Sequence, residues 1–384
     1  MLQYFDKKLY LPYISNTKRI KVKTAIIYSD ELKNYDFGPG HPFRGDRFAS
    51  FFQLYEEKLG KNKNFQLIKN SEPASDKELK LWHTQEYIQV VAAASSGTAI
   101  PHLYQFISQD NVNPISGKFP RGIERAARII VRNSILALDF VQEKRSEKAV
   151  NVGGGLHHAK SGYGEGFCFY NDVVIAARYA MEKYNLKRIL ILDTDAHAGN
   201  GTCEAFYSDP NVLFIDLHQA GIYPGTGLID EIGEGRGEGF TINLPLAAGT
   251  GNKSYELIFD EIILPLAKQY KPEIVIRYGG SDPHPSDEIT QLGLTLEGFK
   301  MIGSKVKEIS RLCENKSVDL ICSGYKPDVL SKAWLSLITG LANVEVELEE
   351  PLLETKEGQN LAETKELIKR VKENLKPHWE SMNN

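Results

Sequence analysis

The chain has 384 residues, of which 42% are hydrophobic and 25% are charged, a composition that excludes a wholly disordered, collagen-like or coiled-coil protein. Its 46 Lys and Arg residues and 50 Asp and Glu residues give a net charge of −4 that is spread along the chain, so no nucleic-acid partner and no membrane anchor are predicted. Four scattered cysteines, no apolar leader and no run of about 18 apolar residues predict a cytoplasmic protein with reduced thiols.

Short apolar runs rich in β-branched residues alternate with longer segments that have helical spacing. The runs predict strands at residues 23–28, 148–152, 188–192, 212–217, 240–244, 274–277 and 318–322. The longer segments predict helices at residues 123–141, 171–184, 255–270, 296–312, 327–341 and 361–375. Near-continuous apolar strands between helices indicate a parallel sheet that is covered on both faces. The predicted fold class is therefore α/β, with three layers (α/β/α) and a mostly parallel central sheet.

The sequence predicts one domain over residues 1–384, because no Ser/Gly-rich linker and no internal repeat divides it. The only shift in composition is an acidic stretch at residues 344–359, which we expect to cross solvent to the last helix. We therefore expect a core at about residues 24–341, followed by an acidic segment and a helix within residues 342–384.

Polar residues cluster directly after five of the predicted strands. The clusters read, in chain order, GGGLHHA, DTDAHAGNG, DLHQAG, GGSDPH and SGYK. In an open α/β sheet, ligands bind beyond the carboxyl ends of the strands. We therefore expect these Gly, His, Asp and Tyr residues to meet at one edge of the sheet and to form the functional site.

The motif DTDAH contains three side chains that suit a metal ion. In an extended chain, alternate side chains of Asp193, Asp195 and His197 point to the same side. Catalytic metal sites usually use three protein ligands and leave one position open. Asp282 in GGSDPH is the natural third ligand beside Asp195 and His197. An isolated Asp at a strand end is more often a cap or turn residue, so this interpretation depends on the shared sheet edge.

The adjacent histidines His157 and His158 follow a triple glycine, which lets the backbone approach a ligand closely. Neighbouring histidines are commonly a surface feature, but at this edge they are candidates for acid–base work. Asp193 and Asn200 remain available to orient them. Because an Asp partner favours the imidazolium and an Asn partner does not, we expect the two histidines to have different pKa values and roles.

Tyr325, in the motif SGYK, follows the last predicted strand. A tyrosine beyond a strand end is usually a packing residue. Its place on the same edge makes it a candidate hydrogen-bond donor to an oxyanion that develops during a reaction.

Six segments, in order, resemble the motifs of the histone deacetylase superfamily, which includes acetoin-utilisation proteins and acetylpolyamine amidohydrolases. GGGLHHAKSGYGEGFCFYNDVVIAA resembles its histidine-pair segment, DTDAHAGNGT its metal-ligand strand and DLHQAGIYPGTG its rim loop. GEGRGEGFTINLPLAAGTG resembles its glycine-rich stretch, GGSDPHPSDEITQLGLT its third-ligand segment and SGYKPDVLSKAW its tyrosine segment. The resemblance runs from about residue 24 to residue 341 and is far more specific than one short pattern. It implies an arginase/deacetylase-like fold whose catalytic core covers these residues.

The resemblance implies a role for each catalytic residue. Asp195, His197 and Asp282 become the metal ligands. His158 becomes the general base and then the general acid. The remaining implied catalytic residues are His157 held by Asp193, Asn200 beside His158, and the oxyanion donor Tyr325.

The resemblance also implies which residues bind the substrate. Phe167 and Tyr223 resemble the aromatic pair that walls an acyl-lysine tunnel, with Gly166 next to Phe167. Ile289 matches the gate position, which is usually Leu in acetyl-lysine enzymes and Glu in acetylpolyamine enzymes. Asp110 is our choice for the acidic rim residue that grips the substrate backbone.

The implied activity is that of a zinc-dependent amidohydrolase that removes acetyl or related acyl groups from lysine side chains of proteins or peptides. Two Asp and one His form a fairly hard ligand set, which suits Zn²⁺ and also Fe²⁺. The implied partner is an acetylated lysine peptide or protein, or an acetylated small amine, and oligomerisation stays open. Asp216 stands near the family's monovalent-cation site, where Ser is common, so K⁺ near Asp193 and Asp216 is a further prediction.

The chain departs from the family pattern in several places. Ala198 stands where a second His is frequent, and Asn200 stands where many members have Asp, although the class II branch also uses Asn. The usual glycine run before the tyrosine reads Cys322, Ser323 and Gly324, which we expect to reshape the tunnel floor.

Three alternatives remain open at this stage. An acetylpolyamine or other small-amide amidohydrolase differs only at the gate, where Glu288 precedes Ile289. A binuclear manganese ureohydrolase would require a further Asp at the position of Gly199. A catalytically silent acyl-lysine-binding protein is disfavoured by the intact histidine pair and tyrosine.

Overall fold

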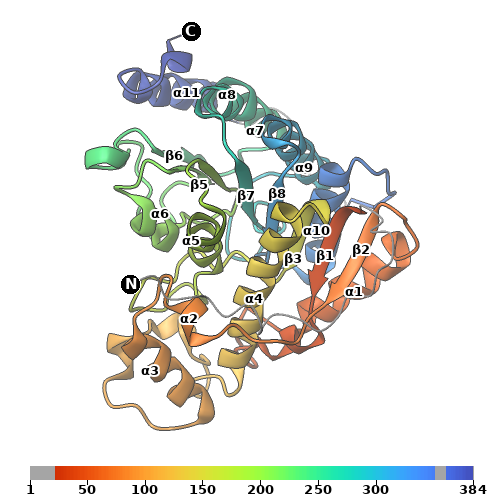
Figure 1. The fold of residues 1–384 in the computed structure, drawn as a ribbon, viewed down its shortest axis with the longest axis vertical. Coiled ribbons are helices and arrows are strands. Elements are labelled where there is room, and N and C mark those ends of the chain that lie inside the picture. The colour runs from red at the N-terminus through yellow and green to blue at the C-terminus, as the bar shows by residue number, and fades with distance from the viewer. Residues whose placement is uncertain (1–21, 351–359, 384) are drawn as a thin grey trace, which may run out of the picture.

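The computed structural model describes residues 22–350 and 360–383 (Figure 1). A sheet of eight strands lies at the centre of these residues, in the order β2-β1-β3-β8-β7-β4-β5-β6, and its pairings are all parallel. The strands are β1 (Val22–Tyr28), β2 (Phe65–Lys69), β3 (Ser146–Val152), β4 (Ile189–Asp193), β5 (Val212–Gln219), β6 (Thr241–Leu246), β7 (Ile274–Gly279) and β8 (Ser317–Ile321).

Helices connect and cover these strands. They are α1 (Asp46–Leu59), α2 (Asp76–Leu79), α3 (Gln85–Ser96), α4 (Ile123–Gln142), α5 (Asp172–Tyr184), α6 (Asn200–Phe206), α7 (Asn252–Ile258), α8 (Leu264–Tyr270), α9 (Leu296–Ser310), α10 (Pro327–Ala342) and α11 (Leu361–Leu375). A five-residue π-helical segment, Phe259–Ile263, joins α7 to α8.

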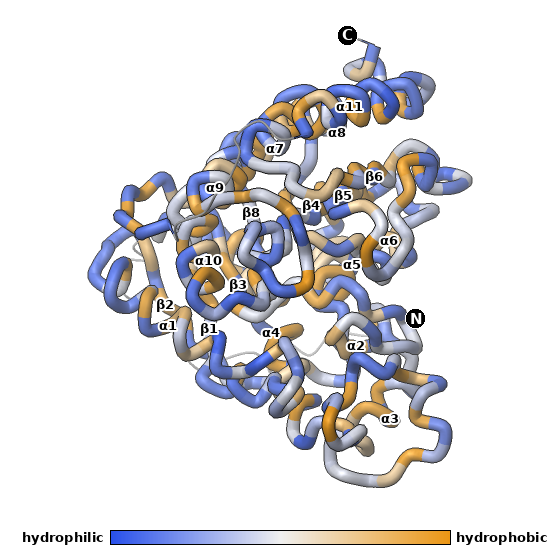
Figure 2. Tube along the Cα trace, turned by 180° about the vertical axis from the view of Figure 1, so that it is seen from behind, coloured by the Kyte–Doolittle hydropathy of each residue, from blue (hydrophilic) through white to orange (hydrophobic). Residues whose placement is uncertain are grey.

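Successive strand residues point to opposite faces of the sheet, and each face packs against its own helices. One buried cluster joins α4 and α5 to strand residues such as Ile191 and Ile276. The other joins α1, α9 and α10 to residues such as Leu190 and Val275. Helices α4 and α5 lie in front of the sheet in Figure 1, and α9 and α10 come forward in the opposite view of Figure 2. The three-layer prediction is confirmed, and the sheet is wholly parallel.

The elements that the sequence did not predict lie mainly in the first hundred residues. Strand β2 is an edge strand that pairs only with β1, and Phe65 is its one fully buried residue. Its sequence therefore lacks the continuous apolar run that marks the central strands. Helices α1 and α3 were likewise not predicted. The helix predicted at residues 255–270 is interrupted by the π-helical segment between α7 and α8.

The C-terminal helix α11 was predicted with the same limits, Leu361–Leu375, and it packs beside α7 and β6. Its buried residues include Leu367, Val371 and Leu375, and Trp379 just beyond it is buried too. The acidic stretch is described as far as Glu350, whose carboxylate accepts hydrogen bonds from His284 Nε2 and the backbone of Leu296. Residues 351–359 of that stretch lie outside the described residues.

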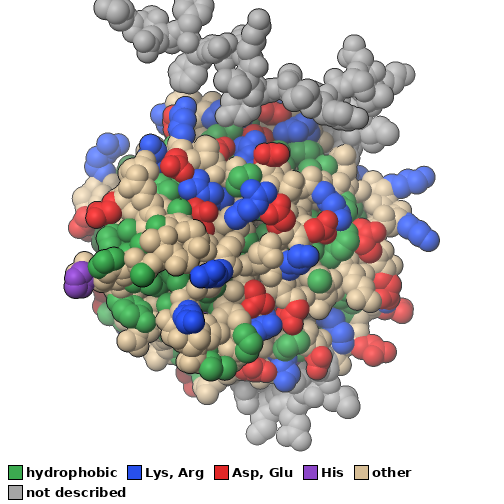
Figure 3. All heavy atoms as spheres, turned by 90° about the horizontal axis from the view of Figure 1, so that it is seen from below, with side chains coloured by type: hydrophobic (Ala, Val, Ile, Leu, Met, Phe, Trp, Pro, Cys, Tyr) green, Lys and Arg blue, Asp and Glu red, His purple; other side chains and the backbone are tan. Residues whose placement is uncertain are grey.

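The surface carries both signs of charge. Figure 3, which views the molecule from below, shows Lys and Arg side chains mixed with Asp and Glu side chains over that face. Within the described ranges, no helix combines the length and the apolar character that crossing a lipid bilayer requires.

The four strands in the middle of the sheet place the candidate site. Strands β3, β8, β7 and β4 are consecutive neighbours, so the loops that leave their carboxyl ends are adjacent in space. These loops carry GGGLHHA, SGYK, GGSDPH and DTDAHAGNG. Residues that are far apart in the sequence therefore meet at one edge.

Candidate metal and catalytic centre

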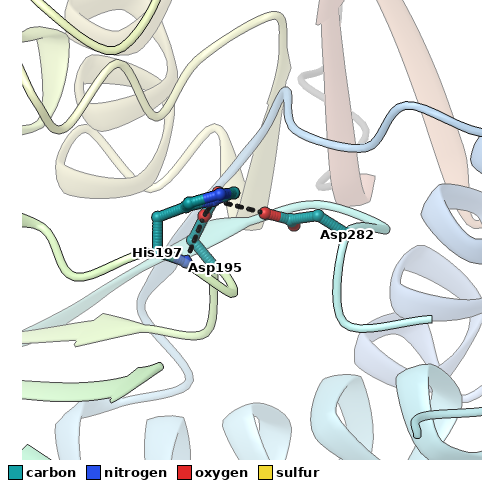
Figure 4. Close-up of side chains that lie close together, drawn as sticks. All are labelled: Asp195, His197 and Asp282. Carbon is teal, nitrogen blue, oxygen red and sulfur yellow. Dashed lines mark hydrogen bonds and ion pairs between the residues drawn. The ribbon is translucent and has the colours of Figure 1, made fainter. Parts of the chain in front are cut away.

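Asp195, His197 and Asp282 lie together where β4 and β7 end (Figure 4). One potential ligand atom from each residue lies within 4.8 Å of those of the other two, and all three side chains are buried. His197 Nδ1 is 3.1 Å from Asp195 Oδ1 and 3.2 Å from Asp282 Oδ2. The structure thus brings together the three residues that the sequence predicted as metal ligands.

The backbone after β4 is folded by its own carboxylates. Asp193 Oδ1 accepts a hydrogen bond from the amide of Asp195 at 2.9 Å, and Asp195 Oδ1 accepts one from the amide of His197 at 2.9 Å. Such bonds from a carboxylate to the amide two residues later turn the chain. Asp282 Oδ2 accepts from the amide of Ala196 at 3.2 Å, and this bond ties the loop after β7 to the loop after β4.

The electrostatics of the cluster favour a bound cation. Burial and the neighbouring charge of Asp195 raise the pKa of Asp282 to about 7. Burial lowers the pKa of His197, but hydrogen bonds to the two carboxylates outweigh it and raise that pKa to about 10. Two buried carboxylates beside each other need a positive charge to be stable. Two carboxylates and one imidazole, converging on one point, therefore fit a divalent metal ion such as Zn²⁺ or Fe²⁺.

The histidine pair lies next to this cluster, with the predicted partners. His157 Nδ1 is 2.9 Å from Asp193 Oδ2, and His158 Nδ1 is 2.8 Å from Asn200 Oδ1. Burial lowers the pKa of both histidines, and the charges of His157 and His197 lower that of His158 further. An Asp partner was expected to favour the imidazolium of His157, and an Asn partner to leave His158 near its ordinary pKa. Burial instead holds both pKa values below the ordinary value, and that of His158 well below it.

Asp216 pairs with Asp193 in the register of β4 and β5. Its carboxylate accepts hydrogen bonds from the amide of Gly199 and from His218 Nδ1, both at 2.8 Å. Burial and the charges of Asp216 and Asp195 raise the pKa of Asp193 well above its ordinary value. Potassium binding near Asp193 and Asp216 stays a prediction.

A cavity leads to the cluster, and aromatic rings form part of its wall. The rings of Phe167 and Tyr325 line it and contact each other edge-on, with centroids 5.8 Å apart. Tyr223, the second aromatic residue predicted for the wall, lies edge-on to His158 with centroids 5.1 Å apart, but it is 41% exposed and does not line this cavity. Ile289 is 39% exposed. The cavity is lined by Phe43, Gly155, Leu156, His157, His158, Gly166, Phe167, Cys168, Asp195, His197, Cys322, Ser323 and Tyr325.

The loop that carries Phe167 is held in an unusual backbone conformation. Gly166 has a φ of +58°, and a Cβ atom added there would lie 2.1 Å from His158 Cδ2, so only glycine fits. The amide of Gly166 donates to Asp110 Oδ2 at 3.0 Å, and that of Phe167 donates to Asn111 Oδ1 at 2.8 Å. In this structure Asp110 therefore supports the Gly166 loop.

Several contacts at the site were not predicted from the sequence. Ser323 Oγ donates to Asp282 Oδ1 at 2.6 Å. Asp287 accepts from the amides of Tyr325 and Ile289 at 2.7 and 3.0 Å, which connects the candidate oxyanion donor to the gate. Glu165 Oε1 accepts a hydrogen bond from Nδ2 of Asn200, the residue whose Oδ1 faces His158. A lone Ser, Asp or Glu in a loop carries no spacing signal, so only the folded geometry reveals these contacts.

Comparisons with known proteins agree with this geometry. The histone deacetylase domain family matches residues 41–341. A probable deacetylase of Archaeoglobus fulgidus is 34% identical over 93% of this chain and 98% of its own length. The acetoin utilization protein AcuC of Staphylococcus aureus (strain MRSA252) is 34% identical over 82% of each chain, and histone deacetylase 10, chloroplastic, of Oryza sativa subsp. japonica is 34% identical over 76% of this chain and 68% of its own.

A solved structure, the HDA15 HD domain, superimposes with a TM-score of 0.79. The similarity covers 94% of this chain and 97% of that chain at 25% sequence identity. The family match spans most of the chain and includes every strand loop that contributes to the candidate site. This protein belongs to the histone deacetylase family.

Proposed function

We propose that this protein is a zinc-dependent deacetylase that removes acetyl or related acyl groups from lysine side chains of proteins or peptides. The observation that carries the proposal is a cavity lined by Asp195, His197, the histidine pair and Tyr325, with the buried carboxylate of Asp282 completing a cluster of three potential metal ligands. Relatives that are named deacetylases support this reading.

In this proposal the carboxylates of Asp195 and Asp282 and the imidazole of His197 hold the metal ion. When bound, the ion supplies a Lewis acid for the acyl carbonyl and lowers the pKa of the attacking water. Zn²⁺ suits three protein ligands with one open position. The iron ion Fe²⁺ suits the same set of two carboxylates and one imidazole.

In this proposal His158 transfers the proton, first as the general base and then as the general acid. Its Nδ1–H is held by Asn200 Oδ1, which leaves Nε2 free to accept a proton from water. Burial and two neighbouring histidines lower the pKa of His158, so its neutral, proton-accepting form prevails at neutral pH. The same nitrogen then returns the proton to the leaving amine. Asp193 holds His157 by a hydrogen bond, and the ring of His157 packs against that of His158.

Tyr325 supplies the hydrogen bond to the oxyanion of the tetrahedral intermediate. Asp287 fixes its backbone amide, and the guanidinium of Arg47 lies 5.4 Å from the centre of its ring. Burial raises the pKa of Tyr325 well above the ordinary value, so the phenol keeps the proton that it donates.

The gate favours an acyl-lysine substrate over an acetylated polyamine. Ile289 places an exposed apolar side chain at the gate position. The adjacent carboxylate of Glu288 lies 3.8 Å from Lys326 Nζ, which partly balances its charge. A polyamine enzyme would need an uncompensated carboxylate at this point to bind a second ammonium group.

The first experiment measures acetate release from a pool of acetyl-lysine peptides and, in parallel, from acetylated polyamines. The Asp195→Ala protein gives the background. Release mainly from peptides supports the proposal, and release mainly from polyamines assigns the protein to the small-amide branch. No release from either by the zinc-loaded protein, together with binding of the peptides, would identify a silent acyl-lysine-binding protein instead.

A further inference from the structure

Glu165 lies where two parts of the candidate site meet. Its Oε1 accepts a hydrogen bond from Asn200 Nδ2 at 2.9 Å, and its Oε2 accepts one from the hydroxyl of Tyr223 at 3.3 Å. The side chain is only 15% exposed, and Lys160 Nζ lies 3.4 Å from Oε1. One carboxylate therefore connects Asn200, the partner of His158, to Tyr223, whose ring lies edge-on to His158.

The backbone around Glu165 fixes the direction of this side chain. The amide of Cys168 donates to the carbonyl of Glu165 at 2.9 Å, and the two residues form an antiparallel bridge. Gly166 and Phe167, the residues between them, are held by Asp110 and Asn111. The carboxylate is thus presented from a short, tightly bonded turn.

The contact with Asn200 settles which way its amide group points. An asparagine side chain has a donor end and an acceptor end, whereas a carboxylate can only accept. The NH₂ group of Asn200 must therefore face Glu165, and its oxygen must face His158 Nδ1. It follows that His158 carries its proton on Nδ1 and exposes the lone pair of Nε2 to the cavity.

An aspartate at position 200 would need no such neighbour, because both of its oxygens accept. With asparagine, either end of the amide can face the histidine, and the reversed amide would place the proton on Nε2 and block the base. The chemistry of Asn200 therefore creates the need for an acceptor behind it, and Glu165 meets that need.

We propose that Glu165 is a positioning residue that fixes the tautomer of His158 through Asn200 and holds the ring of Tyr223 beside His158. The inference rests on the proposed deacetylase function for its kinetic effects only. The tautomer itself can be observed without turnover.

The kinetic test compares Glu165→Ala and Glu165→Gln with Glu204→Gln. Glu204 is the matched control, because its carboxylate also lies near Lys160, at 3.9 Å, but is 48% exposed. We expect Glu165→Ala to lower kcat about tenfold or more and to raise KM, because both contacts are lost. Glu165→Gln keeps the size of the side chain but can donate as well as accept, so kcat should fall with little change in KM. Glu204→Gln should behave as the unmodified protein.

The decisive variant adds Asn200→Asp to Glu165→Ala. An acceptor-only side chain at position 200 no longer needs Glu165, so kcat should recover at least in part while KM stays raised. A purely structural role of Glu165 would give no recovery. Thermal unfolding of each variant verifies that the compared proteins are folded. If Glu165→Ala keeps its kcat, or if the folded double variant does not recover, the proposal is overturned.

A second readout separates this proposal from the proposed function. Imidazole ¹⁵N chemical shifts report the tautomer of His158, whose signals are identified by their loss in His158→Gln. We expect the Nδ1-protonated form in the unmodified protein, a mixture in Glu165→Ala and a return to the Nδ1-protonated form in the double variant. An unmodified protein that releases no acetate would overturn the proposed function. Spectra that do not change in Glu165→Ala would overturn the role of Glu165.

Discussion

The hydroxyl of Ser323 donates a hydrogen bond to Asp282 Oδ1, while Oδ2 of the same carboxylate faces His197 and the amide of Ala196. Each oxygen of Asp282 thus has a fixed partner. The serine stands in the segment Cys322–Gly324, where the family's glycine run would provide no side chain. Partners of this kind orient metal ligands and tune how tightly the metal is held.

The variant Ser323→Ala should therefore weaken metal binding by about 10- to 100-fold, in line with other residues that orient metal ligands. Competition with a chelator at defined free Zn²⁺ concentrations measures this directly and needs no turnover. Ser304→Ala, an exposed serine on α9, is the control. Equal zinc affinity in both variants would show that the hydroxyl does not support the metal site.

Tyr325→Phe removes one oxygen atom and keeps the ring that packs against Phe167. Loss of an oxyanion donor typically costs about a hundredfold or more in kcat, and we expect a loss of this size with little change in KM. Steady-state kinetics with an acetyl-lysine peptide give both numbers. Near-normal turnover of this variant would remove Tyr325 from the mechanism.

At the scale of the elements, the start of α5 is built around His83. The His83 Nε2 atom accepts a hydrogen bond from the amide of Asn171 at 3.0 Å, and Nδ1 is 3.3 Å from the carbonyl of Ser161. Asn171 is the N-cap of α5, and its Nδ2 donates to the carbonyls of His157 and Ala159. His83 therefore supports the histidine-pair loop from a distant part of the sequence.

Burial lowers the pKa of His83 to about 3, so the folded protein keeps this histidine neutral. The unfolded chain binds a proton there below about pH 6.5, and the folded chain does not until about pH 3. Because the unfolded state binds more protons in this window, the free energy of unfolding falls as the pH is lowered, by about 1 kcal/mol per pH unit from this residue. Above about pH 6.5 His83 is neutral in both the folded and the unfolded chain, so its titration no longer lowers the free energy of unfolding.

His83→Gln should flatten that dependence, because glutamine can accept from Asn171 and donate to Ser161 without titrating. Urea unfolding at several values between pH 5 and pH 6.5 measures the slope for both proteins. Identical slopes would mean that His83 contributes nothing to the pH dependence of the unfolding free energy in this range. At pH 7 His83 is neutral in both states, so the two proteins differ only in the hydrogen bonds to Asn171 and Ser161. We expect glutamine to make these bonds less well, so the variant should have the lower free energy of unfolding at this pH.

The strands that could be predicted from the sequence are those whose residues are buried along nearly their whole length. Strands β4 and β7 are buried along their whole length and appear as continuous apolar runs, whereas β2 contacts one neighbour and has an irregular burial pattern. The meeting of Asp195, His197 and Asp282 with the histidine pair could be predicted because their motifs follow such strands. Contacts made by Ser323 and Glu165 could not, because they depend on side-chain directions in irregular loops.

At the scale of the whole molecule, the C-terminal helix closes the outer end of the sheet. The indole Nε1 of Trp379 donates to the carbonyl of Gly239, and its ring contacts Phe240 and Tyr270 edge-on. Through these contacts the residues after the acidic stretch share the core of the main fold. One domain over residues 1–384 stays a prediction.

Trp379→Ala should cost about 3–5 kcal/mol of unfolding free energy, as for other buried tryptophans. If the chain is one cooperative unit, this loss should shift a single unfolding transition that is the same by circular dichroism and by tryptophan fluorescence. Two separate transitions would show instead that the tail unfolds by itself. The candidate metal site should bind added Zn²⁺ equally tightly in the folded variant and in the unmodified protein.

The order of the strands has a consequence for how the protein is made. Strands β7 and β8 lie between β3 and β4 in the sheet, yet they are the last strands to leave the ribosome. Until then, the facing edges of β3 and β4 have no neighbours and are open to wrong pairing. Asp195 and His197 are also synthesised well before Asp282. A chain that is interrupted before β7 therefore lacks Asp282, so the three residues of the candidate metal site can come together only after β7 has been made.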